Sequence, residues 1–306
     1  MTRLKASLME DGGRAASDSQ QFFRSPEFLA AEDATHTLAV PDADLRIPLL
    51  VRPVEGAGRQ DAISPYGYPG GSAAPDAPLD PSEIDWSQTG LVSIFIRDRI
   101  GERACLAGGT IRSQVHVARG DGGIRKRLRE QIRRNERDGW SVETIPGPEA
   151  GDQSRAAFER AYAQTMARTE ATDRYLYEAS YFHRLLQSER SWLLLASLES
   201  ERLAGAIAVA SDDYLHYYLG GTVDDALRAS PMKNLFAAMI ALGGELELPL
   251  NLGGGIATGD SLGDFKRGFA NESADFRTHQ VIADPVAYEE LSGASAPEGF
   301  FPAYRA

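Results

Sequence analysis

Alternation of apolar and polar residues predicts an antiparallel sheet in the second half of the chain. Three segments of strand length follow one another there, with turn residues between them. Short turns between consecutive strands favour antiparallel pairing of neighbours. The three segments are SWLLLASLE (191–199), LAGAIAVAS (203–211) and YLHYYLGGT (214–222).

A helix and a further strand follow this meander. Ser230 is a good N-cap, Pro231 suits the first helical position, and Gly243 suits the end of the helix. The apolar run at 248–252 predicts the next strand. The order of meander, crossing helix and strand argues against a doubly wound parallel sheet.

The first half of the chain predicts further strands. Residues 37–54 alternate and break at Pro41 and Asp42, as two strands joined by a turn would. Shorter strand candidates lie at 91–96 and 113–117. Strands and helices mixed in this order predict an α+β protein.

Composition suggests how the chain is divided. Residues 1–18 are polar and are expected to be mobile. The Pro/Gly-rich stretch TIPGPEAGD at 144–152 is the best domain boundary. We therefore predict an N-terminal module at 19–145 and a C-terminal module at 146–306.

The most charged stretch is DGGIRKRLREQIRRNERDG (121–139), which predicts a helix with Asp121 at its N-cap and Gly139 just past its end. Residues 125–139 contain seven Lys and Arg residues and three acidic residues, which gives this segment a net charge of +4. The exposed surface of this helix is therefore either a solvated face or an anion-binding face. Apolar residues recur every four positions along it, at Ile124, Leu128 and Ile132.

The charge of the whole chain limits its partners. The formal net charge is -12 at pH 7, with 42% apolar and 25% charged residues, a balance typical of soluble globular proteins. Contacts to nucleic-acid phosphates require Lys and Arg, so nucleic acid would have to bind at a local basic face. We expect no DNA partner.

Cysteine content and hydropathy indicate the compartment. Cys105 is the single cysteine, and the first residues contain no apolar leader segment. No window contains 18 consecutive apolar residues, so no membrane span is expected. Together these observations predict a cytoplasmic protein.

Several catalytic signatures are absent from the sequence. There is no GxxxxGK[ST] phosphate loop and no GxSxG nucleophile motif. The five histidines show no metal-ligand spacing with each other or with Cys105, and the glycines at 253–255 do not complete a dinucleotide fingerprint. We expect neither a metal nor a bound cofactor.

The segment 191–252 resembles the GNAT acyltransferases, in which a central strand splays from its neighbour and leads into a loop and helix that bind the activated acyl donor. Free N–H groups at a helix N-terminus attract phosphate. The resemblance places Arg228, Ser230 and Lys233 at the donor phosphates. The sequence here, DDALRASPMKN, departs from the [QR]xxGx[GA] signature of members that use acetyl-CoA.

A narrower resemblance covers residues from about 20 to 285. The basic helix, the strand end LGGG and the motif DSLGDFKRGF are similar to Fem-type aminoacyltransferases and their natural-product relatives. It implies two tandem GNAT-like modules, each a mostly antiparallel mixed sheet flanked by helices, with the acceptor on the N-terminal side. It also implies an aminoacyl-tRNA donor near Arg133 and Arg134, an amine acceptor, and charge stabilisation by Lys266.

The length of the helical region bears on the acceptor. Residues 155–188 suffice for only two ordinary helices, so the inserted arms of some cell-wall members are missing. Their absence favours resemblance to the smaller relatives that act on metabolites.

Direct attack of an amine on an activated ester or thioester requires positioned charge and a route for the amine proton. We expect Lys266 to stabilise charge, the alternative being a surface lysine beside two core phenylalanines. Asp264 is either a proton acceptor, an orienting group for the lysine, or a helix cap. His216 is the histidine placed on the central strand to act as a base.

The loop ISPYGYPGG (63–71) combines stiff prolines, turn-forming glycines and two amphipathic rings. We expect its Ser64, Tyr66 and Tyr68 to form a wall of the acceptor groove, the alternative being a structural loop between strands. The other acceptor candidates are Tyr218, Gly254 and Gly255.

Three functions remain open. The first is an amide synthase that takes an aminoacyl group from the acceptor end of tRNA and passes it to a small-molecule amine. The second is an N-acyltransferase whose donor is the thioester of an acyl carrier protein or of CoA. The third is a non-catalytic binding module with the same fold.

Overall fold

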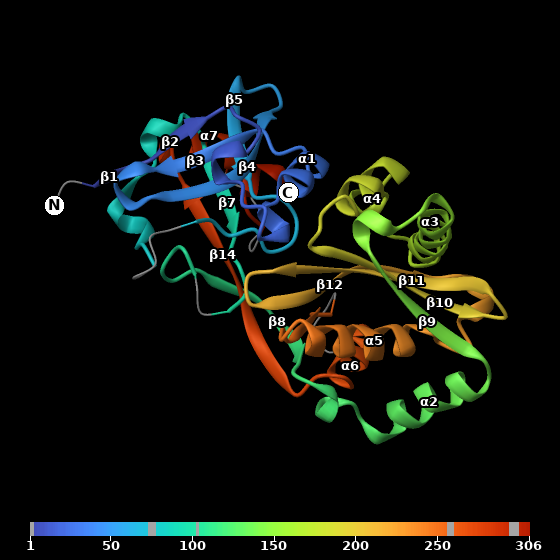
Figure 1. The fold of residues 1–306 in the computed structure, drawn as a ribbon. Coiled ribbons are helices and arrows are strands. Elements are labelled where there is room, and N and C mark those ends of the chain that lie inside the picture. The colour runs from blue at the N-terminus through green and yellow to red at the C-terminus, as the bar shows by residue number, and fades with distance from the viewer. Residues whose placement is uncertain (1–2, 73–77, 102–103, 256–259, 294–299) are drawn as a thin grey trace. The chain divides into compact units, whose positions relative to one another are not determined.

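The computed structural model contains two compact units (Figure 1). The first unit comprises Met1–Ser19, Phe23–Ser113 and Asp275–Ala306, and the second comprises Gln20–Phe22 and Gln114–Ala274. Each unit has its own hydrophobic cluster. The structure describes residues 3–72, 78–101, 104–255, 260–293 and 300–306.

The observed division differs from the predicted boundary between 145 and 146. The chain passes between the units within β8 (Thr110–Ala118) and again within β14 (Glu272–Ile282). The Pro/Gly-rich stretch instead ends β9 (Trp140–Pro146) and leads into α3 (Asp152–Arg168), inside the second unit. A crossing strand has no excess of Pro or Gly, so composition carried no signal for it.

The segment that precedes residue 19 contributes strands to the first unit, contrary to the expected mobility of residues 1–18. β2 (Ser7–Met9) pairs with β3 (His36–Val40), and Ala6 is 1% exposed. The polar composition was misleading because edge strands keep one polar face toward water. The shortest strands, which pair in parallel, are β1 (Leu4–Lys5) and β6 (Ile84–Asp85).

The sheet strands of the first unit follow the order β2-β3-β4-β5-β7-β14. Their neighbours are antiparallel except for β5 and β7, which are parallel. The predicted break after residue 40 is confirmed, because β3 ends at Val40 and β4 begins at Leu45. The remaining elements of this unit are β4 (Leu45–Val54), β5 (Arg59–Ile63), β7 (Ser93–Arg97), α1 (Pro26–Ala31) and α7 (Pro285–Ser292).

The sheet strands of the second unit follow the order β8-β13-β12-β11-β10-β9. β12 and β13 are parallel, and the other neighbours are antiparallel. The predicted meander is thereby confirmed, together with the strand that follows the crossing helix. The bounds are β10 (Ser191–Leu198), β11 (Glu201–Ser211), β12 (Tyr214–Thr222) and β13 (Leu250–Gly253).

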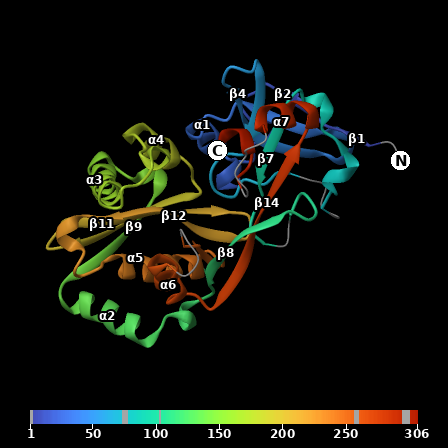
Figure 2. The same cartoon turned by 180° about the vertical axis from the view of Figure 1, so that it is seen from behind.

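Helices cover both faces of the second unit's sheet (Figures 1 and 2). α3 and α4 (Ala179–Leu185) lie on one face, and α5 (Met232–Glu245) and α6 (Ser261–Arg267) lie on the other. α2 (Lys126–Arg137) packs against α5. Among the helices of the described residues, none has the length and apolar character needed to cross a bilayer.

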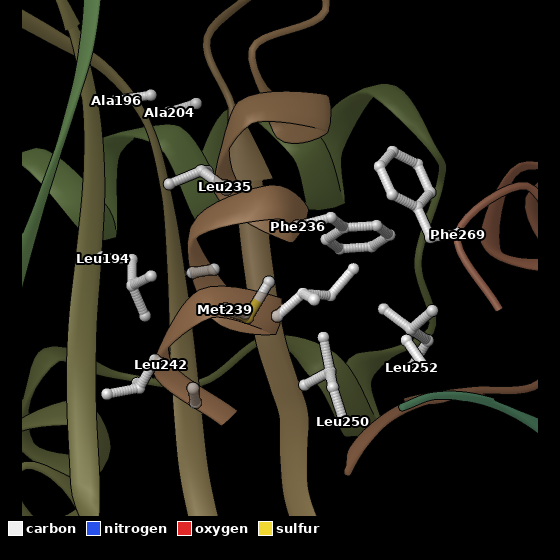
Figure 3. Close-up of a cluster of buried hydrophobic side chains, with 14 of the residues drawn as sticks. Leu194, Ala196, Ala204, Leu235, Phe236, Met239, Leu242, Leu250, Leu252 and Phe269 are labelled. Atoms are coloured by element: carbon white, nitrogen blue, oxygen red, sulfur yellow. The ribbon is translucent and has the colours of Figure 1, made fainter. Parts of the chain in front are cut away.

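The apolar side of α5 forms the centre of this unit's core. Leu235, Phe236 and Met239 are at most 1% exposed. Figure 3 shows them among side chains that include Leu194 of β10 and Leu250 of β13. Burying a side chain of this size contributes about 1.5–3 kcal/mol, so α5 is held to the sheet by packing.

The basic helix α2 begins later than predicted. Asp121 belongs to a short 3-10 turn, and Arg125 precedes the first helical residue without a capping side chain. Gly139 adopts a φ of 96° just past the helix end, as expected for a residue there. Ile132 is buried and Leu128 packs against the same core, which confirms the narrow apolar stripe.

Replacing Leu235 tests the role of α5 in the core. We expect Leu235→Ala to lower the free energy of unfolding by about 2–5 kcal/mol, because the lost methyl groups leave a cavity. Ala241→Gln, at an exposed position of the same helix, should change it by about 0.5 kcal/mol or less. Urea denaturation measures both, and equal effects would show that Leu235 is not a core position.

Candidate functional site

The sheet of the second unit opens at the junction of β12 and β13. These strands pair at only two positions, Leu215 with Leu250 and His216 with Asn251. β12 continues to Thr222, with no further pairing to β13 among the described residues. Where the two parallel strands diverge, their backbone N–H and C=O groups no longer pair with each other and can bind other partners.

A β-bulge lies directly beyond this junction. The register between β12 and β11 shifts after Ile207, so Tyr218 has no partner position on β11. Its hydroxyl lies 2.7 Å from that of Tyr181, and its ring meets Phe22 edge to face. Bulges redirect side chains and are common beside active sites. The predicted acceptor residue Tyr218 therefore lies at an irregular point of the central strand.

Side-chain hydrogen bonds hold the junction together. His216 Nε2 lies 3.2 Å from Ser211 O, and His216 Nδ1 lies 3.0 Å from Asn251 Nδ2. An amide nitrogen only donates, so Nδ1 accepts and Nε2–H donates to Ser211. Asn251 Oδ1 then accepts a hydrogen bond from the Gly253 N–H at 2.7 Å. This relay fixes the end of β13.

The environment of His216 argues against its predicted role as a base. The side chain is 2% exposed, and both ring nitrogens have partners. Burial lowers its pKa to about 4, although the Ser211 carbonyl and Asp212 favour the charged form. A base must reach the proton that it accepts. His216 is placed instead to position β13.

Lys266 lies at the end of this relay. It is 7% exposed, and its Nζ donates a 2.8 Å hydrogen bond to Gly254 O. The ammonium group also lies 5.5 Å from the centre of the Tyr217 ring. Burial lowers its pKa to about 8, with the Asp260 carboxylate partly opposing this shift. Lys266 is therefore a buried group that is still mainly cationic at neutral pH.

The start of α6 is formed by Asp260, whose carboxylate accepts from the Gly263 N–H at 2.6 Å. A Cβ on Gly255 would lie 2.3 Å from that carboxylate, so Gly255 allows close approach of the two segments. Asp264, predicted beside Lys266, is exposed and forms an ion pair with Arg267 at 2.5 Å. Gly254, in contrast, contacts Lys266 directly.

A pocket of about 760 Å³ lies at the N-terminal end of α5. It is lined by α2, α3, the β10–β11 turn and the segment between β12 and α5. Three predicted donor residues, Arg134, Arg228 and Lys233, line it together, whereas Ser230 and Arg133 are not among its lining residues. The predicted grouping of the basic helix with the α5 start is therefore present in the structure.

Buried amides join α2 to the start of α5. Asn135 Nδ2 donates to Asn234 Oδ1 at 2.8 Å and to Ala229 O at 3.1 Å. Asn135 and Asn234 are 6% and 5% exposed, so breaking either contact would leave a buried polar group unpaired. This pair holds the basic face of α2 beside the pocket.

Cations and carboxylates both line this pocket: Arg134, Arg160, Arg228 and Lys233 lie there with Asp138, Glu201 and Asp225. Arg127, Arg228 and Lys233 form no ion pair with the residues that the structure describes, while Arg134 is paired with Asp138 at 3.5 Å. Burial and the nearby Arg127 lower the pKa of Lys233. Because Arg228 and Lys233 have no ion-pair partner among the described residues, they are available to an anion that enters the pocket.

Helix α5 does not use the predicted cap. Its N-cap is Pro231, without a side-chain hydrogen bond, and its first helical residue is Met232. Ser230 has a φ of 52°, so it belongs to the turn that enters the helix. The Ser-Pro pair therefore locates the start of α5 to within one residue. The turn moves the N-cap from Ser230 to Pro231.

The acceptor candidates of ISPYGYPGG lie in the first unit, and they are held by packing. Ser64 Oγ accepts from the Arg97 N–H at 3.1 Å, and the Tyr66 N–H donates to Glu32 at 2.8 Å. The Tyr68 ring lies edge-on to Phe23 and Phe276. The loop is therefore rigid, and its contact with an acceptor stays a prediction.

His116 was missed from the sequence. It is half-buried on β8, opposite Gly253 of β13. The positive charges of Arg267 and Lys266 lower its pKa. The strand candidate SQVHV was recognised, but its neighbour in the sheet was not. Across the described residues, no three His, Cys, Asp or Glu side chains gather as a metal site.

Comparison with known proteins identifies the second unit. Residues 122–267 match the family model described as "Acetyltransferase (GNAT) domain". The matched segment lies within the second unit, which is therefore similar to GNAT domains. No curated protein matches the chain by sequence.

The chain is also similar to solved structures that extend beyond the GNAT domain. FemX is 13% identical, with a TM-score of 0.61 over 90% of this chain and 96% of that chain. L-PGS from Bacillus licheniformis is 12% identical, with a TM-score of 0.60 over 84% and 87%. The C-terminal domain of a putative lysylphosphatidylglycerol synthetase from Agrobacterium fabrum is 13% identical, with a TM-score of 0.58 over 90% and 92%. At these identities the likeness shows a shared fold, and it confirms the predicted α+β architecture with GNAT-like sheets.

The burial of His216 predicts a pH-dependent stability. Its pKa is about 4 in the folded second unit and about 6.5 when unfolded, so the unfolded state gains the proton first as pH falls. Between pH 7 and pH 4.5, wild type should lose about 2–3 kcal/mol more unfolding free energy than His216→Gln.

Urea denaturation at both pH values measures this difference. His183→Gln, which alters an exposed histidine of α4, should behave as wild type. Equal losses in wild type and His216→Gln would show that His216 is not held neutral.

Proposed function

We propose that this protein forms an amide by transferring an aminoacyl group from aminoacyl-tRNA to the amine of a small molecule in the cytoplasm. The GNAT domain supplies the acyltransferase fold. The observation that carries the choice of donor is that two pocket cations, Arg228 and Lys233, form no ion pair with the described residues and lie beside the basic helix α2.

The placement of these cations suits an extended polyanion. Arg228 and Lys233 line the pocket, and α2 continues the positive charge along its exposed surface. Phosphates near the acceptor end of tRNA would contact α2 while the terminal nucleotide enters the pocket. The likeness to FemX and to the C-terminal domain of a putative lysylphosphatidylglycerol synthetase supports an aminoacyl donor.

The reaction requires no covalent enzyme intermediate. The amine attacks the ester carbonyl, the carbonyl oxygen becomes negative, and the ribose oxygen leaves with a proton. Lys266 is buried and cationic, and no carboxylate of the described residues forms an ion pair with it. A buried cation held by Gly254 O is suited to stabilise the negative oxygen, because few water molecules screen it.

A thioester donor is the alternative. The matched family is described as an acetyltransferase domain, and an acidic acyl carrier protein or CoA would also bind basic residues of α2. The segment between β12 and α5 departs from the acetyl-CoA signature, which favours the tRNA donor. A binding module without catalysis is the third candidate, and the buried Lys266 disfavours it.

A donor assay separates these candidates. The protein is incubated with tRNA charged with ¹⁴C-labelled amino acids and a panel of small primary amines, and products stable to mild alkali are counted, because amides survive conditions that hydrolyse aminoacyl esters. Prior digestion of the tRNA with ribonuclease should abolish the product. Product formation from acyl-CoA or acyl carrier protein alone would instead establish the thioester reaction.

Substitution of Arg228 or Lys233 tests the donor pocket. We expect Arg228→Gln and Lys233→Gln each to raise the KM for the donor about tenfold, since one phosphate contact is lost, and to lower the salt slope of binding by about one. Arg112→Gln, at an exposed position outside the pocket, should change neither. A KM that stays constant in both pocket variants would exclude this site.

The pKa of Lys266 predicts the alkaline limb of the rate profile. Lys266 loses its proton near pH 8, so kcat should fall as pH rises through this value. Lys266→Arg should keep activity above pH 9, because a guanidinium remains charged there. Lys266→Met should lower kcat by about 10²–10³ at pH 7.

Two results would contradict this role for Lys266. One is an unchanged alkaline limb in Lys266→Arg, and the other is full activity in Lys266→Met. Lys5→Met, at an exposed lysine of β1, provides the matched control.

A further inference from the structure

His116 lies beside the junction of β12 and β13. It occupies β8, which pairs with β13 in antiparallel orientation and places His116 opposite Gly253. Its neighbours Val115 and Val117 are each 1% exposed. Because side chains alternate along a strand, His116 points to the opposite face from these valines. Ala118, on the same face as His116, packs in the cluster that contains α5.

The surroundings of His116 bring it close to Lys266. The charged groups that act on its ring, among the described residues, are Arg267, Lys266 and Asp264, all on α6. Burial is the largest influence on its pKa and lowers it, Arg267 and Lys266 lower it further, and Asp264 opposes them. The imidazole is therefore neutral at physiological pH.

His116 differs from His216 in the use of its ring nitrogens. Both nitrogens of His216 are engaged by Ser211 and Asn251 in a fully buried position. His116 is half-buried and forms no hydrogen bond or ion pair with the residues that the structure describes. It therefore retains an acceptor nitrogen without a protein partner among the described residues, on a side chain that is partly exposed.

We propose that His116 is the general base of the acyl transfer, a role that rests on the proposed function. The amine nitrogen forms its bond to the carbonyl carbon, and His116 takes the proton that the nitrogen loses. The bond from the carbonyl carbon to the ribose oxygen then breaks. The imidazolium of His116 returns its proton to that oxygen, so the enzyme ends in its starting state.

The other candidates are already engaged. Lys266 is cationic at neutral pH and donates to Gly254 O. Asp264 is paired with Arg267 on the exposed side of α6. His116 is then a neutral base and Lys266 a charged acid in the same pH range. Different surroundings give neighbouring titratable groups different roles in this way.

Substitution of His116 tests the proposal, with the amine and donor pair that the donor assay finds most active. His116→Gln should lower kcat about 10²-fold and leave the donor KM unchanged, since the side chain acts on the amine proton. The fall of kcat/KM at acid pH, where wild-type His116 becomes protonated, should disappear. In His116→Ala, added imidazole should restore part of the rate, which a purely structural residue would not allow.

His183→Gln, which alters the exposed histidine of α4, serves as the matched control and should keep the wild-type profile. If His116→Gln folds but retains kcat and the acid limb, or if imidazole fails to restore His116→Ala, the role of His116 is overturned while acyl transfer stands. If wild type forms no amide from any donor, the proposed function fails, and the role of His116 fails with it.

Discussion

The site depends on the short parallel contact between β12 and β13. Parallel strands cannot be joined by a tight turn, so α5 crosses between them and starts at the end of β12. Backbone pairing stops after two positions, and the side chains of His216 and Asn251 hold the strands where it stops. The pocket beside the α5 start and the place of Lys266 beyond the end of β13 follow from this geometry.

The second unit uses positive charge in two ways. The cations of α2 and the pocket face solvent, where they attract an anion over a distance of about a Debye length and are weakened by salt. Lys266 is buried, so its charge acts at short range and is little screened. Such a division suits a donor whose phosphates lie apart from its reacting carbonyl. A local basic surface of this kind is compatible with a net charge of -12 over the whole chain.

Local patterns were sufficient to predict the meander, the crossing helix and the strand after it, because each has its own periodicity. The FK motif was sufficient to single out Lys266, and the charge pattern to single out α2. Hydrogen-bond partners between side chains could not be predicted from the sequence. His216 and Asn251 are 35 positions apart, and only the strand pairing shows that they meet. His116 was missed for the same reason. Asp121 and Ser230 have the right chemistry for caps, yet the turns that precede their helices displace them.

The path of the chain between the units imposes an order on folding during synthesis. All of the second unit has been made by residue 274, whereas the first unit still lacks β14. Until β14 arrives, β7 has an open edge that can pair with other chains. The carboxylate of Asp61, 0% exposed in the finished unit, also gains its contacts with Tyr304 and Arg305 only from the last residues. A ribosome that stalls after residue 274 therefore holds a chain whose second unit is complete and whose first unit is unfinished and prone to aggregation.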